Sequence, residues 1–164
     1  MAVVTLLDLV QNGTLDAHVG ALLWTIAEEK RWMVTAAVPR KAGKTTVLDA
    51  ALQFVPRDTP IHRLDGTLEE IVSLGTKPDE GYLFPGEIST EPPARYIWGE
   101  RVTALFRALR RGFSLATTMH AVSVEDVFDQ ICRRNGIGDE DASKIQYVVY
   151  VERRGESEDS YSRR

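Results

Sequence analysis

The sequence predicts a single α/β domain, built on a mostly parallel sheet with helices on both faces. Strand-like and helix-like segments alternate along the chain, which is the pattern of parallel strands joined by helices. Two strand-like segments, 32–38 and 145–151, are almost continuously apolar or aromatic, as expected for strands buried on both faces. A length of 164 residues with 43% hydrophobic content suits one domain with a substantial core.

The elements of the first half follow from periodicity and from capping and breaking residues. Residues 3–30 have apolar side chains at helical spacing and are split at Asn12-Gly13. After the first strand, a helical pattern ends before Pro56, and Thr67 and Glu70 have the spacing of a capping box. We therefore expect helices within 1–31 that pack on the domain, a strand at 32–38, a helix at 45–55, a strand at 61–64 and a helix at 67–74.

The second half repeats the alternation. Apolar residues at helical spacing precede Gly112, a typical helix-ending residue, and Ser123 with Asp126 has the spacing of a helix start. The tail at 153–164 is charged and serine-rich, so we expect it to be disordered. The expected elements are a strand at 82–84, a helix at 93–111, a strand at 113–119, a helix from 123 to near 136, and a strand at 145–151.

Composition excludes several function classes. A formal net charge of −4 argues against a globally basic nucleic-acid or membrane binder. Cys132 is the only cysteine, so the chain has no internal disulfide framework and no cysteine cluster with zinc spacing. The N-terminal apolar residues lack a preceding basic region, and no 18 apolar residues run together. We expect a cytoplasmic protein without direct membrane insertion.

The turn after the first apolar strand has the ending of a phosphate-binding loop. It reads VPRKAGKTT over residues 38–46 and leads into a helix, so its backbone N–H groups and the helix dipole would face an anion. In such a loop Lys44 would bind the β- and γ-phosphates and the Thr45 hydroxyl would bind Mg²⁺. The alternative is that Lys44 is an ordinary solvated lysine. The candidate nucleotide-binding residues are Pro39, Arg40, Lys41, Ala42, Gly43, Lys44, Thr45 and Thr46.

Further strings occur in an order that resembles one ATPase family. Pro78-Asp79, then YLFPGEI at 82–88, then SLATTMHAVSVED at 114–126 follow the AGKTT of the loop. Together they resemble the core of the motor ATPases of type II and type IV secretion, across about residues 5–152. The resemblance implies a RecA-like P-loop NTPase fold, ATP and Mg²⁺ as cofactors, assembly into a homo-oligomeric ring or with secretion or pilus machinery, and ATP hydrolysis that drives secretion, pilus assembly or macromolecule transfer.

The resemblance also implies three catalytic candidates. Glu87 matches the Walker B glutamate, which would hold Mg²⁺ and polarise the attacking water; otherwise it is a turn carboxylate. His120 matches the histidine-box residue, which would sense the γ-phosphate; otherwise it is structural. Asp65 matches the catalytic glutamate of the family's acidic box, but an aspartate before Gly66 is equally typical of an ordinary turn.

The chain also departs from that family. Val38 and Lys41 replace small residues of the loop, Ser89 replaces an arginine, and Pro85 interrupts the Walker B strand. The family generally has an N-terminal domain that clamps nucleotide and supplies arginines across the subunit boundary. The resemblance therefore implies a compact form in which either another chain supplies those groups, or hydrolysis is slow or absent. Two functions therefore stay open: an ATPase, or a degenerate regulatory or assembly subunit that does not hydrolyse ATP.

A basic stripe on the predicted helix at 93–111 makes DNA contact a third hypothesis. Arginines three and four residues apart share one helix face. A solvated face or a subunit contact is the alternative. The arginines are Arg95, Arg101, Arg107, Arg110 and Arg111.

Overall fold

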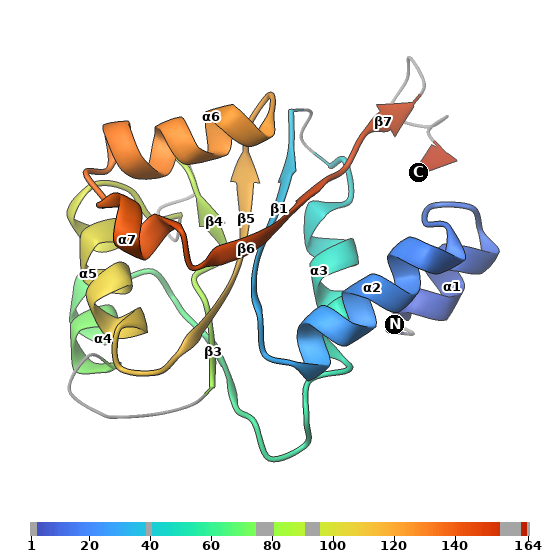
Figure 1. Cartoon of the computed structure of the whole chain (residues 1–164), viewed down its shortest axis with the longest axis horizontal. Helices are drawn as coiled ribbons and strands as arrows, with labels where there is room; N and C mark the ends of the chain where they lie inside the picture. Colours follow the sequence, from blue (N-terminus) through green and yellow to red (C-terminus); the bar gives the residue numbers. More distant parts are fainter. Residues whose placement is uncertain (1–2, 39–40, 75–80, 91–95, 155–161, 164) are drawn as a thin grey trace.

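A six-stranded parallel sheet organises the chain (Figure 1). The computed structural model describes residues 3–38, 41–74, 81–90, 96–154 and 162–163. Five strands lie in the order β2-β3-β5-β1-β6, and β4 pairs with β5 beyond the end of β3. All these pairings are parallel, which confirms the predicted α/β class. The strands are β1 (Trp32–Ala37), β2 (Ile61–Arg63), β3 (Tyr82–Phe84), β4 (Glu87–Ile88), β5 (Ser114–His120) and β6 (Ile145–Tyr150).

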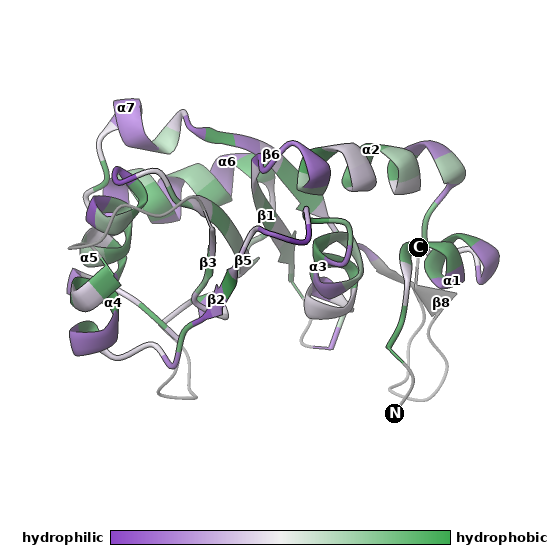
Figure 2. Ribbon diagram, turned by 90° about the horizontal axis from the view of Figure 1, so that it is seen from below, coloured by the Kyte–Doolittle hydropathy of each residue, from purple (hydrophilic) through white to green (hydrophobic). Residues whose placement is uncertain are grey.

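Helices cover both faces of this sheet, and each face has its own core. Residues of β1 alternate between the two cores, as a strand buried on both sides requires: Met33 packs toward α1–α3, and Val34 packs toward α4–α7. Figure 2 shows the two helical groups on opposite sides of the strands. One group is α1 (Leu6–Gln11), α2 (Ala17–Glu28) and α3 (Lys44–Leu52); the other is α4 (Leu68–Leu74), α5 (Glu100–Leu109), α6 (Val124–Phe128), the π-helix η1 (Asp129–Arg134) and α7 (Asp139–Ala142).

Glycine and proline set two boundaries that the periodicity did not predict. Pro85 and Gly86 interrupt the strand after Phe84, and Gly86 has φ of 81°, so the pairing resumes as the separate strand β4. The predicted helix at 93–111 begins instead at Glu100. Gly99 precedes it with φ of 62°, a value that a right-handed helix cannot continue through. Residues 91–95 lie outside the described part of the chain.

The C-terminal segment differs from the expected disorder at its two described ends. β7 (Arg153–Arg154) pairs in an antiparallel ladder with β8 (Ser162–Arg163). The residues between these strands, and residue 164, lie outside the described residues. In the part of the chain that the structure does describe, no helix is both long enough and apolar enough to cross a membrane.

Candidate nucleotide-binding site

The candidate loop lies where neighbouring strands send their connections to opposite faces. β1 and β5 are adjacent and parallel, and Ala37 at the end of β1 is in register with His120 at the end of β5. The chain leaves β1 into α3 on one face and leaves β5 into α6 on the other. In open parallel sheets, such a divergence at the carboxyl edge leaves a crevice where ligands bind. The fold therefore places the predicted loop and the predicted histidine at the same carboxyl edge of the sheet.

The loop presents the start of α3 without a side-chain cap. Gly43 is the N-cap residue, has φ of 101° and makes no capping hydrogen bond through a side chain. The Val47 amide donates to the Gly43 carbonyl at 3.0 Å, so the three amides before it, those of 44–46, precede the intrahelical pattern. They and the positive end of the helix dipole form an anion-binding arrangement. Ala42 is buried beneath the turn, whereas Pro39 and Arg40 lie outside the described residues.

Lys41 occupies a left-handed conformation that glycine would adopt more easily. Its φ is 59°, and its side chain is exposed. Such a conformation costs an L-residue about 1–2 kcal/mol, but it is sterically allowed. The chain therefore forms the turn even though Lys41 stands where the resembled family has a small residue.

Lys44 and Glu87 come together although 43 positions separate them in the chain. Lys44 Nζ lies 3.5 Å from Glu87 Oε2, and the two side chains are 7% and 13% exposed. Thr45, the next residue of α3, is exposed, and Thr46 is half-buried. The pair places a cation and a carboxylate together at the start of α3. The structure thus contradicts the alternative that Lys44 is an ordinary solvated lysine, because its side chain is buried against a carboxylate.

Thr118 is a candidate site residue that the sequence motifs did not indicate. It is in register with Thr35 on one side and with Glu87 on the other. Its hydroxyl lies 3.2 Å from Glu87 Oε2 and 3.1 Å from the Gly86 carbonyl oxygen, so its one proton is within reach of either the carboxylate or the backbone of the same turn. Strand alternation offered the signal: Thr118 lies two residues before His120, within the quoted ATTMHA string, and therefore on the same face of β5.

His120 lies at the half-exposed end of β5, beside the start of the loop. Its backbone carbonyl accepts a hydrogen bond from Gln130 Nε2 at 2.8 Å, which connects the end of the strand to η1. His120 therefore lies at the same edge of the sheet as the predicted loop. Its role in sensing phosphate stays a prediction.

Asp65 follows β2 at the far side of the sheet, two strands beyond β5. Its Oδ1 accepts a hydrogen bond from the Thr67 amide at 2.7 Å, and the Asp65 amide donates to Glu70 Oε2 at 2.8 Å. The Thr67 amide holds the pKa of the Asp65 carboxyl below its ordinary value, with further lowering by the Thr67 and Glu70 side chains. A carboxylate stabilised in this way is a weaker base. The local geometry favours the turn interpretation of Asp65.

The arginines of the proposed basic stripe are partly engaged within the domain. α5 ends at Leu109, so Arg110 and Arg111 lie at and beyond its end. Arg110 makes a bidentate contact with Asp141, with Nη2 to Oδ2 at 2.6 Å, and Arg101 Nη1 donates to the Gly66 carbonyl at 3.1 Å. These contacts favour an internal structural role over DNA binding at both positions. Arg95 lies outside the described residues.

The Arg110–Asp141 pair predicts a pH-dependent contribution to stability. The Arg110 hydrogen bond is the main cause that lowers the pKa of the Asp141 carboxyl from its ordinary 3.8. Because the folded-state pKa is depressed, the stabilisation is fully present above pH 3.8 and is lost as the pH falls through the folded-state value. Arg110 is 63% exposed, so screening by solvent keeps this contribution to stability small.

Urea unfolding of wild type and Asp141→Asn between pH 3 and pH 7 checks this prediction. We expect Asp141→Asn to be less stable at pH 7, and the difference to shrink toward the acid end. Asp139→Asn, at the start of the same short helix, is the matched control. A difference that stays constant with pH would contradict the assignment.

Known proteins resemble the chain mainly in fold. No family model matches it. The VirB11 ATPase of the Brucella suis type IV secretion system, crystallised in complex with sulphate, superimposes with a TM-score of 0.59 at 16% sequence identity, over 96% of this chain and 53% of that one. The chain has the fold of that ATPase. An uncharacterized protein of Methanocaldococcus jannaschii is 26% identical over 151 residues, which cover 76% of this chain and 52% of that protein. The chain thus spans about half the length of both matches.

Proposed function

We propose that the chain binds ATP with Mg²⁺ at the turn between β1 and α3 and hydrolyses it. The observation that carries this proposal is the contact between the buried Lys44 and the partly buried Glu87 at the uncapped start of α3. A phosphate-binding loop needs a cation at this position, and hydrolysis needs a carboxylate near it. The shared fold with a secretion-system ATPase supports the proposal.

The residues present suit the roles that this chemistry requires. Lys44 binds the β- and γ-phosphates, and the amides of 44–46 hold the phosphate oxygens. The exposed Thr45 hydroxyl and the Glu87 carboxylate are oxygen donors, which Mg²⁺ prefers. When bound there, Mg²⁺ would neutralise part of the negative charge of the phosphates. Glu87 orients the attacking water, and Thr118 holds the Glu87 carboxylate in place.

At the level of the assembly, we propose a motor that works as a ring or with secretion or pilus machinery. The structural neighbour is named as an ATPase of a type IV secretion system, and the ordered motifs of this chain resemble the same kind of motor. Arginines that complete the site would come from a neighbouring subunit. Turnover should then depend on association between chains.

A non-hydrolysing regulatory or assembly subunit is the second candidate. Two observations favour it: Lys41 occupies a left-handed position at an energetic cost, and the Asp65 carboxylate is held within its own turn by Thr67. Such a subunit would bind ATP and use it as a structural ligand. The two candidates differ in turnover and agree on binding.

Measuring ATP binding and phosphate release over a wide range of chain concentrations separates the two candidates. A motor completed between subunits should show turnover per chain that rises with concentration and then levels off. Binding with no turnover at any concentration would reject the motor and leave the regulatory subunit. Absence of ATP binding at millimolar nucleotide would reject both.

Thr118→Val should lower the rate of ATP hydrolysis about tenfold at saturating ATP, with little change in KM. Valine keeps the shape of the threonine side chain but loses the contact to Glu87. Steady-state kinetics on Thr118→Val and Thr118→Ser check this. The serine variant retains the hydroxyl and should recover most of the rate. If both variants behave alike, or if only KM changes, Thr118 does not position Glu87.

A further inference from the structure

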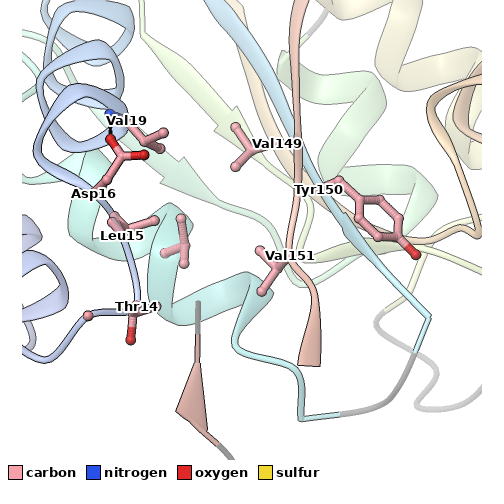
Figure 3. A pocket seen from close by; sticks show the side chains of 9 residues that line it. Thr14, Leu15, Asp16, Val19, Val149, Tyr150 and Val151 are labelled. Atoms are coloured by element: carbon pink, nitrogen blue, oxygen red, sulfur yellow. Dashed lines mark hydrogen bonds between the residues drawn. The ribbon is translucent and has the colours of Figure 1, made fainter. Parts of the chain in front are cut away.

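A largely apolar cavity of about 490 Å³ opens between the turn joining α1 to α2, the first turn of α3, and the end of β6 (Figure 3). None of the residues that line it is among the predicted site residues. The residues that carry the argument are Thr14, Asp16, Val19, Val47, Val149 and Val151. We propose that this cavity binds the base and ribose of a nucleotide. The inference rests on the proposed function, because it needs the phosphates of the same molecule at Lys44.

The position of the cavity fits one molecule that crosses the end of β1. Val47 lies three residues after Lys44, so one wall of the cavity is the helix that begins at the phosphate loop. The opposite wall belongs to β6, whose end is joined to β1 by the hydrogen bond from the Val151 amide to the Ala36 carbonyl at 2.8 Å. Glu87 lies beyond β5, on the other side of β1. The terminal phosphate therefore faces Glu87, and the nucleoside faces β6.

The lining has the chemistry of a nucleoside site. Figure 3 shows Val149 and Val151 pointing to the same side, toward Asp16 and Val19, while the ring of Tyr150 points away. This is the alternation of a strand, and it gives the cavity a wall of branched aliphatic side chains against which a planar base can stack. Small-molecule sites are typically cavities of about 300–1,000 Å³ with apolar walls and few polar groups. The size and the lining both match.

Asp16 supplies the polar group of the cavity at the α1–α2 turn. Asp16 is the N-cap of α2, and its Oδ1 accepts a hydrogen bond from the Val19 amide at 2.8 Å. That bond fixes the carboxylate at the rim and leaves Oδ2 to accept from ribose hydroxyls or from an exocyclic amine of the base. Thr14 is buried, and Figure 3 shows its hydroxyl oxygen pointing away from the two valines. Asp16 thereby offers an acceptor opposite the valine wall.

Affinity measurements with ATP, UTP and tripolyphosphate test the inference, because tripolyphosphate has only the part that Lys44 would bind. Wild type should bind ATP at least about tenfold more tightly than tripolyphosphate, with UTP between them. Val149→Phe fills the cavity from an edge strand. It should weaken the binding of ATP about tenfold, while the affinity for tripolyphosphate changes by less than about twofold. Val72 on α4 is 54% exposed, so Val72→Phe is the matched control and should change the affinity for neither compound.

The outcomes separate this inference from the proposed function. Equal affinity of wild type for ATP and tripolyphosphate, or an equal loss of both in Val149→Phe, would overturn the nucleoside site and leave the phosphate site intact. Failure of wild type to bind either compound would overturn the proposed function itself. If Val149→Phe does not fold, Val19→Phe fills the same cavity from α2 and should give the same selective loss of ATP; unchanged ATP affinity in that folded variant would also overturn the inference.

Discussion

Lys44→Ala is expected to weaken ATP binding by about 100-fold and to abolish measurable turnover. Truncating one member of a buried charge pair typically costs about 2–5 kcal/mol, and here the lost charge is also the one that binds the phosphates. Lys44 is 7% exposed, so solvent cannot replace it easily. Calorimetric titration with ATP, together with phosphate release, measures both effects.

The control for this variant must separate lost binding from lost folding. Removing Lys44 leaves the 13% exposed Glu87 carboxylate without its cation, which by itself destabilises the fold. The double variant Lys44→Ala with Glu87→Gln removes that unpaired charge and should recover stability without recovering ATP binding. Lys144→Ala, at an exposed lysine outside the site, should behave as wild type. Tight ATP binding by a folded Lys44→Ala would contradict the phosphate site.

Glu87→Gln is expected to reduce turnover by about 100- to 1,000-fold while ATP affinity changes by less than about threefold. Glutamine keeps the length and the contact to Thr118 but cannot polarise water as a carboxylate does. It also removes the partner that neutralises Lys44, which leaves the lysine available to phosphate. Single-turnover phosphate release and equilibrium ATP binding separate the two quantities.

Asp65→Asn is the matched carboxylate variant. The Asp65 carboxylate accepts from the Thr67 amide in its own turn, so we expect a loss of turnover much smaller than that of Glu87→Gln. An equal loss in both variants would make Asp65 a second catalytic carboxylate, as its place in the acidic box implies. A parallel fall of binding and turnover in Glu87→Gln would instead mean that Glu87 is structural.

Local sequence signals predicted the strands well and predicted the helix at 93–111 poorly. The strand at 82–84 is observed with the same bounds, and β1 ends one residue before its predicted end. Continuous apolar runs leave few alternatives to a buried strand. The prediction was wrong at the start of the helix, because Gly99 adopts positive φ and Ile97 instead forms a bridge with Ile88. That bridge is a contact between separated segments, and periodicity carries no information about it.

The sequence by itself determined the alternation of strands and helices, the turn that contains Lys44 and the candidate Glu87, because these depend on neighbouring residues. Only the tertiary structure decided that Lys44 lies against Glu87, that Thr118 contacts the same carboxylate, and that residues 13–16, 19, 47 and 149–151 line one cavity. These contacts depend on strand order and register, since β5 stands between β1 and β4. Strand order is set by the packing of the whole sheet, which no local pattern encodes.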